Sequence, residues 1–225
     1  MSSSSRTEER ELVTSLTERA GGGDSTSSGK QSSLRLSVTT RLRPMEGLIA
    51  CGDAVIDLRT NDWHLVGVID ALGHGPDAAL SASAARRAAE ESIGEPLHIV
   101  FEAVHRALPK MRGVVMSAVL LEGVHATFAG VGNVELFGPE GISRPVSMAG
   151  TLGGAPFRFR PFALPMEAGQ RWALVSDGIK AREGGAVFAK HRSAPAREAA
   201  DALLEQASRP HDDVGVLLID VESAS

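Results

Sequence analysis

The sequence predicts an α+β layered fold with mainly antiparallel sheets. Two predicted helices follow one another between runs of predicted strands, instead of alternating with single strands as in a doubly wound parallel sheet. The 225 residues are enough for one sizeable core and too few for two full domains. Residues 1–33 are rich in Ser and Gly and poor in apolar side chains, so we expect a disordered tail before one domain at residues 34–225.

The positions of apolar residues predict the individual elements. Alternating or β-branched apolar residues predict strands at 34–42, 64–69, 114–121, 125–129, 134–137, 157–164, 171–176 and 214–221. Helices are predicted at 77–92, where Ala is frequent, at 96–110, where apolar residues recur with helical spacing, and at 195–207. Asp77 falls in the first turn of the first helix, where a carboxylate interacts favourably with the helix dipole.

Composition argues against several classes of protein. The net charge is −5 and the Lys and Arg residues are scattered, so we expect no nucleic-acid partner. No apolar run approaches the roughly 20 residues of a membrane-spanning helix, so we expect no membrane partner. The single Cys51 excludes an intramolecular disulfide and fits a reducing compartment. We therefore expect a cytoplasmic protein, whose oligomeric state the sequence leaves open.

Four aspartates stand at the boundaries of apolar segments, and glycines lie near three of them: Asp53, Asp70, Asp177 and Asp212. One such aspartate alone is more often a turn or cap residue. Several poorly solvated carboxylates in one place repel one another, and divalent cations relieve that repulsion. Oxygen ligands suit Mg²⁺ or Mn²⁺, whereas no His or Cys pair has the spacing of a zinc site. The pattern therefore indicates a site for divalent metal.

Four short motifs resemble, in order and spacing, those of a known family: Gly52-Asp53, Val68 to Ala79, Ser176 to Ile179, and Asp212-Asp213. They resemble the metal-dependent PPM protein phosphatases, and within these the bacterial SpoIIE branch with its small stand-alone RsbX-like enzymes. The likeness covers residues 34–221 and includes the segment 129–133. It implies a sandwich of two mainly antiparallel β-sheets with flanking helices and, at one edge, a centre of two Mn²⁺ or Mg²⁺ ions.

The resemblance also implies roles for individual residues. Asp70 would bridge both ions, and the carbonyl of Ala71 would bind one of them. Asp177 and Asp212 would complete the shell of the other ion, and Asp53 would act directly or through a bound water. Catalysis would rest on Asp70, Asp177 and Asp53, with an activated water attacking phosphorus in line and no covalent phosphoenzyme. The secondary candidates are Asp213, Gly178 and His74.

Several positions allow more than one interpretation. Ala71 stands where many relatives have Gly, whose backbone adopts more conformations. Arg41 and Arg43 are positional candidates for the arginine that cradles phosphate in eukaryotic relatives. His74 is a candidate general acid, but a turn residue that caps the next helix is the favoured interpretation. His211 either orients Asp212 or is an exposed loop residue.

The sequence leaves three functions to compare. The first is a metal-dependent protein serine/threonine phosphatase acting on a phosphorylated regulatory protein, expected to be a bacterial partner-switching protein of the anti-sigma-antagonist type. The second is a pseudophosphatase that binds such a regulator without hydrolysing it, which Ala71 favours. The third is a small-molecule phosphohydrolase, because the same two-metal chemistry serves many substrates.

Overall fold

The computed structural model describes residues 33–224. The expected tail at 1–33 therefore lies outside the described residues except for its last position. The strands are Leu34–Arg43 (β1), Asp53–Arg59 (β2), Trp63–Ala71 (β3), Val114–Glu122 (β4), His125–Val131 (β5), Glu135–Phe137 (β6), Phe162–Leu164 (β7), Arg171–Val175 (β8) and Val214–Ser223 (β9). The helices are Pro76–Glu91 (α2), Leu97–Ala107 (α3), Ala181–Lys190 (α4) and Ala196–Ala207 (α5).

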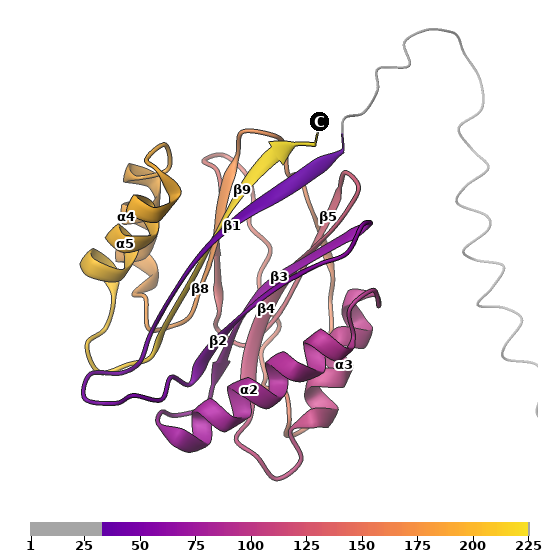
Figure 1. Ribbon diagram of the computed structural model, residues 1–225, viewed down its shortest axis with the longest axis vertical. Helices are drawn as coiled ribbons and strands as arrows, with labels where there is room; N and C mark the ends of the chain where they lie inside the picture. Colours follow the sequence, from indigo (N-terminus) through magenta and orange to yellow (C-terminus); the bar gives the residue numbers. More distant parts are fainter. Residues whose placement is uncertain (1–32, 225) are drawn as a thin grey trace, which may run out of the picture. The chain divides into compact units, whose positions relative to one another are not determined.

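The strands form two sheets, with the orders β1-β9-β8-β6 and β2-β3-β4-β5-β7. Every pair of neighbouring strands is antiparallel. Figure 1 shows α2 and α3 on one side of the sandwich and α4 and α5 on the other. The predicted α+β fold of two mainly antiparallel sheets with flanking helices is therefore confirmed.

Three apolar layers hold these elements together. The layer between the sheets contains Val68, Trp172 and Leu217. The layers beneath the two helix pairs are built from the opposite faces of the same strands, including Ile69 with Phe101 on one side and Val216 with Leu203 on the other. Because successive side chains of a strand alternate between faces, β3 and β9 each contribute to two layers.

The turn between β3 and α2 is made possible by two glycines. Gly73 and Gly75 have φ angles of 83° and 80°, a region that other residues rarely adopt. Pro76 then begins α2 at a position where the missing N–H is not needed, and Asp77 lies in the first turn as predicted. The chain thus leaves the sheet directly after Asp70 and Ala71.

Strand β2 was not predicted, and one predicted strand is too long. The apolar segment before Asp53 is a loop, in which Ile49 is 99% exposed, and β2 begins at Asp53 itself. The strand predicted at 157–164 is confined to Phe162–Leu164. Its earlier part packs against α3, where the rings of Phe159 and Phe101 lie 5.3 Å apart, and Pro161 lacks the N–H that a continuous ladder requires.

One helix was not predicted. The α4 sequence contains two glycines, which lower helix propensity. Packing requires a glycine at position 184, because a Cβ on Gly184 would lie 2.5 Å from the Ile179 side chain. Among the described residues, no helix is both long and apolar enough to cross a membrane.

Candidate metal centre

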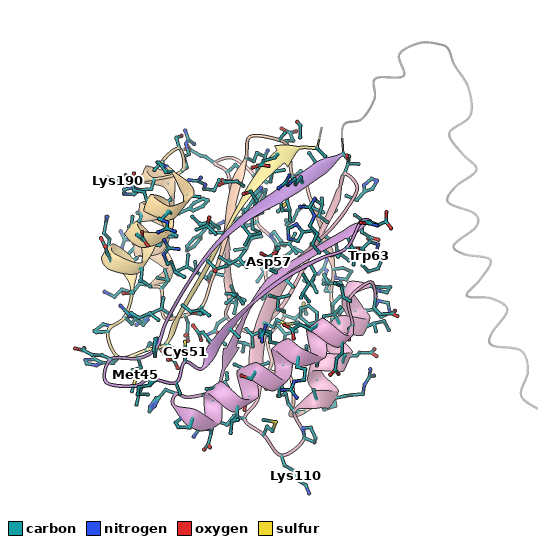
Figure 2. The ribbon with its side chains drawn as sticks, viewed as in Figure 1. Met45, Cys51, Asp57, Trp63, Lys110 and Lys190 are labelled. Carbon is teal, nitrogen blue, oxygen red and sulfur yellow. The ribbon has the colours of Figure 1, made fainter. Side chains whose placement is uncertain are left out.

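The fold gathers the aspartates at one end of the sandwich. Asp53 and Asp70 are directly opposite one another in the β2–β3 ladder, on the face that lines the space between the sheets. Asp177 follows β8 by two residues, and Asp212 precedes its neighbour β9 by two residues. In Figure 2, Met45 and Cys51 mark the end where β2 begins, and Trp63 marks the other end.

Burial makes these carboxyl groups hard to ionise. It raises the pKa of Asp53, whose side chain is only 5% exposed, to about 7, and nearby carboxylates add to the rise. Burial and the charge of Asp53 raise the pKa of Asp70 well above its usual range. The neighbouring Asp177 raises the pKa of Asp70 further. Burial and the charge of Asp177 also raise the pKa of Asp212.

The aspartates of this cluster have no ion-pair partner among residues 33–224. None of the ion pairs in that range involves Asp53, Asp70, Asp177, Asp212 or Asp213. Over the same range, no three His, Cys, Asp or Glu side chains already stand in the geometry of a bound ion. The oxygen-only donor set and the mutual repulsion of these carboxylates fit a hard divalent cation.

Asp53 is oriented by a short hydrogen-bond relay from the opposite sheet. The Ser176 hydroxyl donates to Asp53 Oδ2 at 2.6 Å and accepts a hydrogen bond of 2.8 Å from the Gly215 backbone N–H. Gly215 also leaves room for the carboxylate, since a Cβ there would lie 3.2 Å from Asp53 Oδ2. Sequence reasoning did not assign a role to Ser176, although it directly precedes Asp177.

Asp177 is held by two side chains that the sequence did not single out as site residues. The Asn133 amide donates to Asp177 Oδ2 at 2.8 Å. Arg209 Nε donates to the Asp177 backbone carbonyl at 2.9 Å. Asn133 belongs to the segment 129–133, which was noted for its resemblance, whereas nothing in the sequence marks Arg209.

Asp213 anchors a loop. It is 3% exposed, and its two oxygens accept hydrogen bonds of 2.9 Å each from the backbone N–H groups of Met45 and Gly52. Both bonds hold the segment that leads into Asp53. This position gives Asp213 a supporting task and leaves Asp212, which is less buried, free to face the cluster.

Ala71 fits its position without strain. It is the last residue of β3, its N–H donates to the Gly52 carbonyl at 3.0 Å, and its φ is not positive. Its methyl group is buried in the core beneath α2 and α3. The conformational freedom of glycine is therefore not needed here, and Ala71 gives little support to the pseudophosphatase interpretation.

We expect Ala71→Gly to lower stability without raising metal affinity. The loss of a buried methyl group and the greater freedom of the unfolded chain together destabilise the protein by about 1–2 kcal/mol. Chemical denaturation would measure the stability, and calorimetric titration with Mn²⁺ would measure the affinity, which should change by less than about twofold. A large gain in Mn²⁺ affinity would contradict this account of Ala71.

The other candidate residues lie differently from expectation. His74 is exposed and does not cap α2, whose N-cap residue is Gly75 without a side-chain hydrogen bond, so the capping interpretation is wrong. Arg41 is paired with Asp201 at 2.5 Å. Arg43 donates to Ser208 Oγ at 3.0 Å and to the Arg209 carbonyl at 2.6 Å.

The structure gives neither His211 nor Cys51 a catalytic role. His211 is an exposed loop residue, and none of the hydrogen bonds among the described residues involves its side chain. Burial raises the pKa of the half-buried Cys51 thiol to about 12. A thiol of this kind is a poor nucleophile, which agrees with a packing role for Cys51.

The raised pKa of Asp53 predicts how the metal-free protein responds to pH. Between about pH 4 and pH 7 the unfolded chain has lost this proton and the folded chain retains it. The folded state therefore binds more protons, and stability in EDTA should fall as pH rises through this window. Thermal unfolding from pH 5 to pH 8 checks this, with Asp53→Asn as the control. This variant should reduce the slope of the profile, and the raised pKa values of Asp70 and Asp212 should leave part of it.

The same protons should be released when metal binds. Mn²⁺ titration at pH 6.5 in buffers of different ionisation enthalpy should show net proton release, and the affinity should rise with pH. Metal binding without proton release, together with stability in EDTA that rises with pH, would contradict the assigned electrostatics.

Comparisons with known proteins agree with this geometry. The sequence pattern of the family described as Stage II sporulation protein E (SpoIIE) matches residues 59–222. Phosphoserine phosphatase RsbX of Bacillus subtilis (strain 168) is 29% identical over 140 residues, which are 60% of this chain and 70% of RsbX.

Solved structures show the same fold. One solved structure is described as "The bacterial stressosome: a modular system that has been adapted to control secondary messenger signaling". Its chain is 31% identical with a TM-score of 0.71, and the match covers 82% of this chain and 99% of that one. RsbX in complex with magnesium is 23% identical with a TM-score of 0.73, covering 83% of this chain and 96% of RsbX. The PP2C phosphatase domain of SpoIIE from Bacillus subtilis is 18% identical with a TM-score of 0.69, covering 86% of this chain and 65% of that one. The chain therefore belongs to the SpoIIE family.

Proposed function

We propose that this chain is a metal-dependent protein serine/threonine phosphatase whose phosphatase domain spans residues 34–225. The observation that carries the proposal is the cluster of buried and half-buried carboxyl groups contributed by both sheets at one end of the sandwich. Family membership supports it, since the relative RsbX is a phosphoserine phosphatase. Solved relatives in complex with magnesium or with two manganese ions support a divalent metal.

The ligands of the metal follow from their positions. Asp70, Asp177, Asp212 and the Ala71 carbonyl would hold Mn²⁺ or Mg²⁺, and two ions are proposed. Asp53, held by Ser176, would act directly or through a bound water. Bound divalent ions lower the pKa of a coordinated water and neutralise phosphoryl oxygens during in-line displacement. The hydrogen bonds from Asn133 and Ser176 keep two carboxylates in fixed orientations.

The substrate is proposed to be a phosphorylated regulatory protein of the anti-sigma-antagonist type. Three large apolar side chains are exposed on segments next to the cluster: Ile49 is 99% exposed, Leu72 is 47% exposed and Leu80 is 62% exposed. Exposed apolar groups around a catalytic site suit contact with a protein surface. A cavity of about 790 Å³, large enough for a small molecule, is lined by residues such as Phe137 and Phe188 and by none of these aspartates.

Phosphate release tests the proposal. Purified protein with Mn²⁺ or Mg²⁺ is expected to dephosphorylate a phosphoserine form of such a regulator and to lose this activity in EDTA. Nucleotides and sugar phosphates, compared at equal concentration, should be turned over far more slowly. Equal turnover of small phosphates would favour the small-molecule phosphohydrolase, and tight binding of the phosphoprotein without hydrolysis would favour the pseudophosphatase.

A further inference from the structure

Arg209 lies beside the aspartate cluster with most of its guanidinium unused. Its Nε donates to the Asp177 carbonyl at 2.9 Å. A guanidinium has five N–H donors, and the four on its two terminal nitrogens form no hydrogen bond or ion pair with residues 33–224. The side chain is exposed, yet its charge is close enough to oppose the rise in the pKa of Asp212.

The backbone of Arg209 is fixed from two directions. Its N–H donates to the Gly178 carbonyl at 2.7 Å, next to the bridge between Ile179 and Ser208. Its own carbonyl accepts a hydrogen bond of 2.6 Å from Arg43 Nη2. An arginine held at its backbone and at Nε presents its remaining donors with little further loss of conformational freedom.

The expected phosphate-binding arginines are occupied elsewhere. Arg41 pairs with Asp201, and Arg43 donates hydrogen bonds to Ser208 and to Arg209 itself. Arg43 therefore positions another arginine instead of facing the cluster. A phosphoryl group brought to the aspartates would meet Arg209 as a positive side chain with free donors.

We propose that Arg209 binds the non-bridging oxygens of the substrate phosphoryl group, with Arg43 as the residue that positions it. This inference rests on the proposed function, since it assigns a substrate contact at the same site. A planar guanidinium matches phosphate oxygens and can donate two hydrogen bonds to them at once. Arg209 also bridges the Asp177 segment and the segment that leads to Asp212, so it can align phosphate with carboxylates from both.

The test compares Arg209→Ala and Arg209→Lys with Arg87→Ala, an exposed helix arginine that serves as a charge-matched control. Loss of a charge-assisted contact should raise KM for a phosphoserine peptide and for p-nitrophenyl phosphate about 10–100-fold, with a smaller change in kcat. Arg43→Ala should give a smaller rise, and Arg87→Ala none. Millimolar guanidinium should partly restore Arg209→Ala, an effect that a purely structural role would not produce.

Calorimetric titration adds a measurement that does not depend on turnover. With Mn²⁺ present, inorganic phosphate should bind Arg209→Ala about 10–100-fold more weakly than wild type, whereas Mn²⁺ affinity should change by less than about threefold. Unchanged phosphate affinity, an equal loss of Mn²⁺ affinity, or an effect on a protein substrate alone would overturn the inference. If the wild type is inactive but its phosphate binding still depends on Arg209, the phosphatase function is rejected. The contact between Arg209 and phosphate is then still supported.

Discussion

Asp70→Asn is expected to abolish metal-dependent phosphatase activity while leaving the metal-free fold as stable as wild type or more stable. Asp70 lies opposite Asp53 in the β2–β3 ladder, where burial and the charge of Asp53 raise its pKa. An Asn amide has nearly the same shape and lacks the charge that burial disfavours, so the stability of the metal-free fold is unchanged or higher. In the proposed metal centre Asp70 would bridge two cations, which a neutral amide cannot do, and several kcal/mol of transition-state stabilisation corresponds to a loss of about 10³-fold or more.

Two measurements on the same variant check this expectation. Phosphate release in Mn²⁺ should fall to background, and thermal unfolding in EDTA should give a Tm equal to or above that of wild type. Asp57→Asn, at an exposed carboxylate further along β2, is the matched control and should retain activity. An active Asp70→Asn, or one that loses activity because it unfolds, would contradict the assignment of Asp70 to the metal centre.

Gly178→Ala is expected to destabilise the protein by about 3 kcal/mol or more and to remove activity with it. A Cβ at this position would lie 1.9 Å from the backbone oxygen of Asp213 and 3.0 Å from the Val214 side chain. The Asp213 carbonyl is part of the backbone next to the start of β9, so it cannot rotate away as a flexible side chain can. Either the segment carrying Asp177 or the segment carrying Asp212 must therefore move.

Gly154→Ala provides the control for this substitution. A Cβ there would meet only Thr151 Oγ1, at 3.8 Å, and the backbone conformation is open to alanine. Its unfolding free energy should stay within about 0.5 kcal/mol of wild type. Equal stability of the two variants in urea unfolding would show that the close approach of Gly178 to Asp213 does not exist in solution.

The fold could be predicted because, in most strands, the order of apolar and polar residues in the sequence matches the order of buried and exposed positions. The alternation at residues 34–42 and the apolar run at 114–121 match β1 and β4 to within a residue. The pattern failed where local propensity and tertiary packing disagree. Gly184 argues against a helix on its own, but its missing side chain is what lets α4 pack against Ile179.

The candidate site was only partly visible from the sequence. Aspartates at strand boundaries can be recognised one by one, but their convergence depends on strand order and register, which pair residues far apart in the chain. Ser176 and Arg209 act through hydrogen bonds to residues 123 and 32 positions away. Their types and local sequence carry no sign of such contacts, so only the three-dimensional structure reveals them.

A crystal grown or soaked with Mn²⁺ and examined at the manganese absorption edge tests the metal centre most directly. Anomalous peaks are expected between the carboxylates of Asp70 and Asp177, within about 2.0–2.2 Å of their oxygens, with Asp212 and the Ala71 carbonyl in contact. Asp53 should lie in direct or water-mediated contact with the same ions. A fully soaked crystal with no peak at these aspartates, or with manganese held only by other side chains, would contradict the metal centre.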